Sequence, residues 1–165
     1  MVENFLAKTK NGISVFLDEN SEHAKTHISK FPLLLGATVD LLPTIEVLGD
    51  TFRKDFDVGH TVGTSDLVET DMTDDIVYAL RTHRDRYSRF VKNRQATNSS
   101  WIVIDIRRRS AGSFYLYTCY VGQLTPSFPG GDFLPEKSHG FWSKHALVWG
   151  NQEVVSGSET ATCPW

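Results

Sequence analysis

Two neighbouring β-favouring segments constrain the fold of this chain more than any other feature of its sequence. The isoleucines of Trp101–Ile106 occupy every second position, so they share one face of a strand. Phe114–Val121 is rich in aromatic and β-branched residues, which favour strands. The Ser-Ala-Gly-Ser sequence at 110–113 is typical of a tight antiparallel turn. The sequence therefore predicts a central β-hairpin.

Segments before this hairpin carry a mainly helical pattern. Ile13–Leu17 is a short apolar run after a turn-prone Asn-Gly pair and predicts a first strand or an extended arm. A helix is expected from Ser21 to about Phe31, since a serine oxygen can accept hydrogen bonds from the first amides. A second helix from Leu33 to Leu42 is expected to end at the following proline, which cannot continue it.

The other segments complete an α+β pattern. Residues 45–58 alternate loosely and predict a strand that continues or bends through a Gly-Asp pair, while Ile76–Leu80 and Tyr87–Lys92 predict a hairpin. A last helix is predicted by residues at three- or four-residue spacing, namely Phe141, Trp142, His145, Ala146 and Trp149. We expect N-terminal helices followed by a curved antiparallel β-sheet and a C-terminal helix.

Length and composition predict one globular domain. The chain has 165 residues, of which 40% are hydrophobic and 12% aromatic, which suffices for a packed core. No repeat or linker divides it, so we expect a single domain over residues 1–165 with a loose tail from about residue 151. Its apolar runs are far shorter than the ~18 residues that cross a bilayer, so no membrane partner is expected.

The terminal and cysteine patterns point to a reducing compartment. No basic segment followed by an apolar stretch and a cleavage site opens the chain, so we expect a cytoplasmic protein. Cys119 and Cys163 form neither a disulfide framework nor a paired metal-ligand spacing. We therefore expect free thiols and no metal or other cofactor.

Basic residues concentrate in one part of the chain. Between Arg81 and Arg109, nine basic residues stand against two acidic ones, a local charge of +7, although the whole chain carries −3. Arginine forks bind phosphate and interleaved aromatic rings stack on unpaired bases, so the segment predicts an RNA-binding surface. Its candidate RNA-binding residues are Arg84, Arg86, Lys92, Arg94 and Trp101. The alternative is a solvated sheet face paired with the acidic residues 66–75 just upstream.

Histidines are the candidates for proton transfer near neutral pH. His60 lies between two glycines that let a backbone approach a ligand, with a structural turn as the alternative. His145 falls within an aromatic stripe, where a partly buried structural histidine is the alternative. His23 and His27 are four residues apart and could face one metal, but no third ligand accompanies them, which favours exposed helix positions.

The order of features is similar to that of a known fold. The segments that carry the similarity are Gly59–Ser65, Asp75–Ala79, Arg89–Val91, Ser99-Ser100, Tyr117–Gly122, Phe141-Trp142 and His145–Leu147. They resemble small, uncharacterised prokaryotic proteins with the barnase, EndoU, colicin and RelE-like (BECR) ribonuclease fold. The resemblance covers roughly residues 20–150 and implies a site with a histidine or lysine near a helix, an arginine on a central strand, a serine or threonine on the next strand and a later tyrosine or histidine. The counterparts here are His60, Arg89, Ser100 and Tyr120.

Two functions follow as hypotheses. The first is a metal-independent ribonuclease, toxin-like or RNA-processing, in which His60 or His145 moves protons and Arg89, Lys92 and Arg94 hold the scissile phosphate. The second is a non-catalytic RNA- or protein-binding module whose aromatic residues line a pocket or pack against a partner. RNA is the expected partner, with a protein partner or inhibitor as the alternative. The substrate and the oligomeric state stay open.

Overall fold

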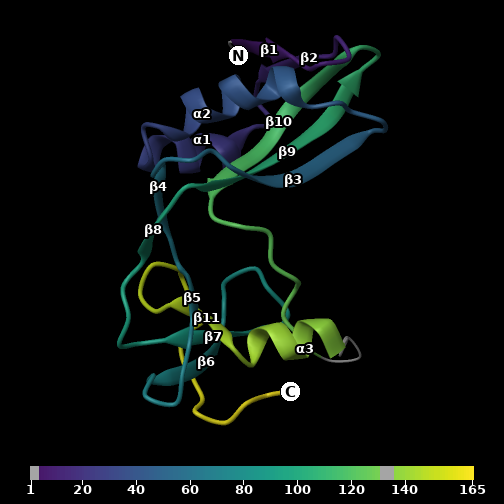
Figure 1. Ribbon diagram of the computed structural model, residues 1–165. Coiled ribbons are helices and arrows are strands. Elements are labelled where there is room, and N and C mark those ends of the chain that lie inside the picture. The colour runs from purple at the N-terminus through teal and green to yellow at the C-terminus, as the bar shows by residue number, and fades with distance from the viewer. Residues whose placement is uncertain (1–3, 131–135) are drawn as a thin grey trace. The chain divides into compact units, whose positions relative to one another are not determined.

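The computed structural model describes residues 4–130 and 136–165 of the chain (Figure 1). It divides into two compact units. Unit 1 comprises Met1–Thr64 and Asn98–Leu124, and unit 2 comprises Ser65–Thr97 and Thr125–Trp165. Two such units can belong to one domain or to two, so the single domain stays a prediction.

Unit 1 contains a five-stranded sheet built around the predicted hairpin. Its strands, in spatial order, are β1 (Asn4–Lys8), β2 (Ser14–Leu17), β10 (Ser113–Val121), β9 (Trp101–Ser110) and β3 (Thr51–Asp57). Neighbours are antiparallel except β2 and β10, which run parallel. The β9–β10 hairpin is confirmed, and β3 begins after the Gly-Asp pair through which a strand was expected to continue or bend.

Two helices cover one face of this sheet. These are α1 (Glu22–Lys30) and α2 (Leu34–Leu41), and the 3₁₀ turn η1 (Leu42–Thr44) follows because Pro43 interrupts the α-helical pattern. Figure 1 shows both helices beside β10. The alternate isoleucines Ile102, Ile104 and Ile106 are fully buried beneath them. The period-2 pattern of β9 thus determines which face of the sheet forms the core.

Unit 2 contains a four-stranded sheet. Its strands, in spatial order, are β5 (Leu67–Glu69), β11 (His145–Val148), β7 (Tyr87–Val91) and β6 (Ile76–Leu80). The predicted β6–β7 hairpin is confirmed, with Tyr78 opposite Arg89. The helix α3 (Glu136–Trp142) precedes β11. Elsewhere in the chain, β4 (Gly63–Ser65) pairs with β8 (Thr97–Ser99).

The C-terminal helix is shorter than the sequence predicted. It ends at Trp142, and the stripe that was expected to continue it instead contains β11. Ala146 and Val148 are buried as alternate residues of a strand that pairs with both β5 and β7. Residues four positions apart share a face in a helix and also in a strand, because four is a multiple of two, and pairing on both edges decides for the strand.

The α+β class is confirmed, but the predicted element order is wrong in detail. β1 and β2 precede the N-terminal helices. The expected single curved antiparallel sheet is instead divided into three sheets over the described residues, two of which contain a parallel pair. These parallel pairs join strands far apart in sequence, which local patterns do not encode.

The segment from residue 151 onward, predicted to be a loose tail, runs along β6. Bridges join Tyr78 to Thr160 and Arg81 to Val154. The Trp165 ring packs edge-on against Tyr78, with 5.3 Å between ring centroids. These contacts cover the outer edge of β6.

None of the helices that the structure describes is both long enough and apolar enough to span a membrane.

Two glycines of unit 1 provide a matched test of how closely Gly63 packs against the Phe31 ring. A Cβ at Gly63 would lie 2.5 Å from the Phe31 ring, whereas a Cβ at Gly36 in α2 would meet nothing within 4 Å. We expect Gly63→Ala to lower the free energy of unfolding by about 1–3 kcal/mol through overpacking. Gly36→Ala should raise it by about 0.5–1 kcal/mol because alanine favours helix. Urea denaturation of both variants measures the difference, and equal effects would contradict the packing.

Candidate functional site

The basic residues that the sequence grouped together are divided between the two units. Arg81, Arg84, Arg86, Arg89, Lys92 and Arg94 belong to unit 2, and Arg107–Arg109 belong to unit 1. Their closeness along the chain therefore does not make them one surface.

In unit 2, three of the predicted phosphate-binding residues have partners within the protein. Arg94 forms a bidentate ion pair with Asp74, at 2.7 Å from Nε to Oδ1 and 3.0 Å from Nη2 to Oδ2. Lys92 lies 3.9 Å from the Glu159 carboxylate. Arg89 Nη1 donates to the Thr70 hydroxyl at 2.7 Å and to a backbone carbonyl at 3.0 Å. These groups are occupied in holding the unit together.

The remaining arginines of unit 2 lie around the β6–β7 turn. Arg81 donates from Nε to Ser88 and from Nη1 to Gln152, and burial, together with the charge of Arg84, lowers the pKa of Arg81 to about 10. Arg84 is exposed, and Arg86 donates to the Phe128 carbonyl at 3.4 Å. Arg94 and Lys92 of unit 2 thus face carboxylates, whereas Arg81, Arg86 and Arg89 donate to neutral acceptors, so they keep their charge but use hydrogen-bonding capacity within the protein.

Histidine and serine candidates differ in their surroundings. His145 of unit 2 stacks on Phe141, with 4.0 Å between ring centroids, and its Nδ1 lies 3.0 Å from the Phe141 carbonyl oxygen. In unit 1, His60 is exposed and has no hydrogen bond, ion pair or ring contact to any described residue. Ser100 donates its hydroxyl to Asp57 at 2.7 Å. Of these groups, His145 has the partners of a structural histidine.

A different group of side chains converges on unit 1, on the sheet face opposite the isoleucine core. Arg53 of β3 and Asp105 of β9 are directly paired across the strands, so their side chains share this face. Arg53 Nη1 lies 2.8 Å from Asp105 Oδ2, and Arg107 Nε lies 3.3 Å from Asp105 Oδ1. The carboxylate is 4% exposed, against 45% for Arg53 and 40% for Arg107. One buried anion thus orients two accessible cations.

Two tyrosines of β10 extend this group. Arg53 Nη2 donates to the Tyr120 hydroxyl at 3.2 Å. The Arg107 guanidinium lies over the Tyr117 ring, with 3.4 Å from Cζ to the ring centroid. Both tyrosines are half-buried. Two cations and two aromatic rings are therefore presented together, a combination suited to phosphates and unpaired bases.

β10 pairs with β2 only over Ser113–Tyr115, so its later residues form an edge along which helix α1 packs, and from this edge α1 brings two imidazoles to the same tyrosines. The His27 ring lies 5.8 Å from the Tyr120 ring and the His23 ring lies 5.5 Å from the Tyr117 ring, measured between centroids. The four-residue spacing places both histidines on one side of α1, which packs against β10. We call the set His23, His27, Arg53, Asp105, Arg107, Tyr117 and Tyr120 the polar face.

Burial adjusts the proton affinities of two of these groups. It lowers the pKa of His27, and the nearby charges of Lys30 and His23 act in the same direction. His27 is therefore a neutral proton acceptor at pH 7. Burial raises the pKa of Tyr120, although Arg53 opposes the rise. The Tyr120 hydroxyl therefore keeps its proton and can donate it in a hydrogen bond.

Of the candidate site residues named from the sequence, Tyr120 belongs to the polar face; Arg107 was included only in the basic segment 81–109, and His27 was interpreted as an exposed helix position. The signal that could have found the rest is the matching spacing of two histidines on a helix and two tyrosines on a strand. That signal becomes specific only when α1 is known to pack against β10. Within residues 4–130 and 136–165, no three or more His, Cys, Asp and Glu side chains are grouped to hold a metal ion.

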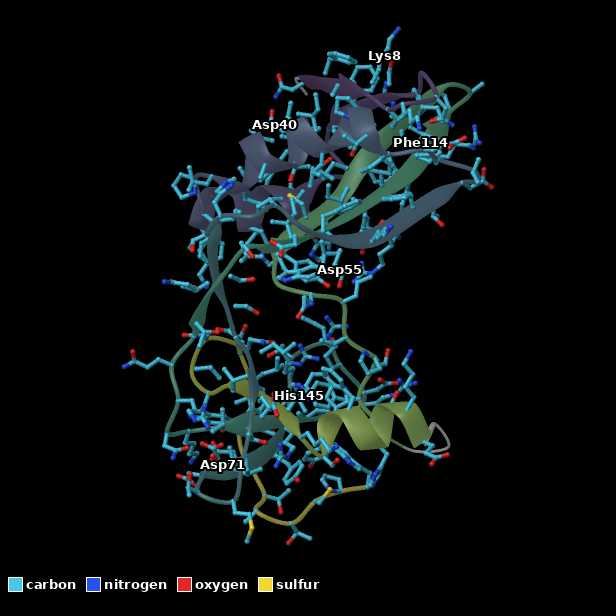
Figure 2. The ribbon with its side chains drawn as sticks, viewed as in Figure 1. Lys8, Asp40, Asp55, Asp71, Phe114 and His145 are labelled. Atoms are coloured by element: carbon cyan, nitrogen blue, oxygen red, sulfur yellow. The ribbon has the colours of Figure 1, made fainter. Side chains whose placement is uncertain are left out.

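The edge strand β3 carries one further carboxylate on this sheet face. Asp55, labelled in Figure 2, lies two residues from Arg53 on the same side of β3 and accepts the Leu124 amide at 2.9 Å. This bond holds the start of the segment that leaves β10.

Searches of family models, curated proteins and solved structures with this chain find no match in any of the three.

The buried carboxylate gives the first prediction from this site. Asp105→Asn removes the charge that pairs with Arg53 and Arg107, so we expect the free energy of unfolding to fall by about 1–3 kcal/mol. Asp50→Asn, which removes the 80%-exposed partner of Arg108, should change it by less than about 0.5 kcal/mol. Urea denaturation at pH 7 measures both. Equal losses would show that Asp105 has no special role.

The lowered pKa of His27 predicts a pH-dependent stability. The unfolded chain takes up a proton near pH 6.5 and the folded chain only at lower pH, so the unfolded state is favoured as pH falls below about 6.5. We expect His27→Gln to lose this contribution, giving a shallower decline between pH 7 and 5. His60→Gln should keep the slope of the original protein. Parallel curves for the two variants would refute the assignment.

Proposed function

We propose that the polar face is the site of a metal-independent ribonuclease that cleaves the RNA backbone by attack of the 2′-hydroxyl. The observation that supports this proposal is the meeting of a neutral imidazole, a protonated tyrosine and two arginines held by one buried carboxylate. These are the groups that the reaction requires: a base, hydrogen-bond donors and cations for the phosphate.

Each group has a role that its contacts suggest. His27 accepts the proton of the 2′-hydroxyl, and the 2′-oxygen then forms a bond to phosphorus. Arg53 and Arg107 neutralise the charge on the crowded phosphate. Tyr120, whose oxygen already accepts a hydrogen bond from Arg53, donates its own hydrogen to a non-bridging phosphate oxygen.

A second proton transfer completes the reaction. His23, one helical turn before His27, donates a proton to the 5′-oxygen as the bond from phosphorus to that oxygen breaks. The products are a 2′,3′-cyclic phosphate and a free 5′-hydroxyl, so atoms and protons balance. The BECR resemblance supports the same reaction class, with His27 in the place that the sequence assigned to His60.

Cleavage of a fluorescent single-stranded RNA in the presence of EDTA tests the proposal. We expect His27→Gln to lower the rate by about 100-fold or more, as for loss of a general base. His60→Gln should leave the rate unchanged. Asp105→Asn should reduce the rate because Arg53 and Arg107 lose the carboxylate that orients them. Product analysis should show a cyclic phosphate end.

The outcomes separate the assignments. Loss of cleavage in His60→Gln but not in His27→Gln would assign the role of general base to His60, the residue that the resemblance indicated. Absence of cleavage with retained, salt-sensitive RNA affinity would leave an RNA-binding module. Neither cleavage nor binding of RNA would overturn the proposed function.

A further inference from the structure

On the side of the sheet where Arg53 and Asp105 lie, the far end of β3 presents a carboxylate opposite an indole. Asp57 of β3 and Trp101 of β9 are directly paired across the strands, four residues along from Arg53 and Asp105. Both pairs therefore face the same side, about 13 Å apart along the strands. The hydrogen bond from Leu124 to Asp55 lies between them, so the Asp57 end is a separate subsite.

Two hydrogen bonds to one oxygen hold the Asp57 carboxylate in place, and its other oxygen receives none from the described residues. The Ser100 hydroxyl donates to its Oδ1 at 2.7 Å and the Gly59 amide donates to the same atom at 2.9 Å. None of the described residues donates to Oδ2. The hydrogen bond from Ser100, supported by that from Gly59, lowers the pKa of the Asp57 carboxyl, so it is ionised and acts only as an acceptor.

Ser100 is fixed from its backbone as well. Its carbonyl accepts the Val58 amide at 2.9 Å, which ties the start of β9 to the end of β3. Its hydroxyl group donates its hydrogen to Asp57, and the hydroxyl oxygen keeps lone pairs with which it can accept. Asp57 Oδ2 and Ser100 Oγ thus offer two acceptors, and the half-buried Trp101 is the cross-strand neighbour of Asp57.

We propose that Asp57, Ser100 and Trp101 form a subsite for a guanine base of single-stranded RNA. The Watson–Crick edge of guanine presents two adjacent donors, N1–H and N2–H, to the two acceptors, while its ring stacks on Trp101. Adenine, cytosine and uracil have no two adjacent donors on this edge, so at least one of the two protein acceptors would face an acceptor of the base. The base must be unpaired because a duplex occupies the same edge.

This subsite deepens the proposed function, since it rests on RNA binding across the polar face. It lies at a distance from Arg53 and Arg107 that an extended dinucleotide can span. Guanine there would select which phosphodiester is presented to His27. Cleavage is therefore expected at a fixed offset from guanosines.

Binding of 2′-O-methyl oligonucleotides tests the subsite without cleavage, because the 2′-hydroxyl is blocked. Heptamers of uridine with a central guanosine, inosine, adenosine or uridine are titrated by fluorescence anisotropy. We expect guanosine to bind about tenfold tighter than adenosine, with inosine, which lacks the 2-amino group, in between. Asp57→Asn should abolish the preference, and Ser100→Ala should remove the difference between guanosine and inosine.

A matched control removes a similar charge elsewhere. Asp50→Asn also deletes one exposed carboxylate of unit 1, and it should retain the guanosine preference. Circular dichroism of each variant checks that the fold is kept. A preference that survives in Asp57→Asn would overturn the subsite.

The failure of each proposal has its own signature. Equal affinity for all four heptamers would overturn the guanine subsite and leave the ribonuclease intact. A guanosine preference in a protein that cleaves no RNA would overturn the ribonuclease and leave the subsite. No affinity for any heptamer would overturn both.

Discussion

The buried carboxylate of Asp105 is the interaction on which the polar face depends. A carboxylate out of contact with water is stable only when it is paired and hydrogen-bonded, and here two arginines supply both. In return, the carboxylate limits the rotamers of long cationic side chains that would otherwise be mobile. Arg53 is thereby directed at the Tyr120 hydroxyl and Arg107 at the Tyr117 ring. The chemistry we propose requires that orientation more than it requires positive charge.

The surroundings of the two arginine groups explain why charge density alone is a poor guide to function. In unit 2, Arg94 faces a carboxylate and Arg89 faces neutral acceptors, so their hydrogen-bonding capacity is used internally. In unit 1, two arginines share the buried Asp105 carboxylate, and 45% of Arg53 and 40% of Arg107 remain exposed, so both guanidinium groups stay accessible. The sequence alone does not distinguish the arginines of unit 1 from those of unit 2. Only their partners distinguish a structural ion pair from a phosphate-binding surface.

The parts of the fold that the sequence predicted are those encoded by neighbours along the chain. The β9–β10 and β6–β7 hairpins, the helix after Ser21 and the helix end at Pro43 all depend on local period, turns or a missing amide. The β11 strand was misjudged because its identity depends on pairing with β5 and β7 on both sides. In the candidate site, Tyr120 was predicted, whereas His27 was assigned to an exposed position.

The sequence by itself determined the α+β class, the isoleucine face of β9 and the presence of enough arginine, histidine and tyrosine for phosphate chemistry. Those properties follow from residue type and from periods of two or 3.6, which need no knowledge of distant contacts. The tertiary structure decided which of those residues meet. Arg53 and Asp105 are 52 positions apart, and they become neighbours because β3 and β9 pair in one register among many that the chain could adopt. A one-residue slip would have turned the carboxylate toward the core.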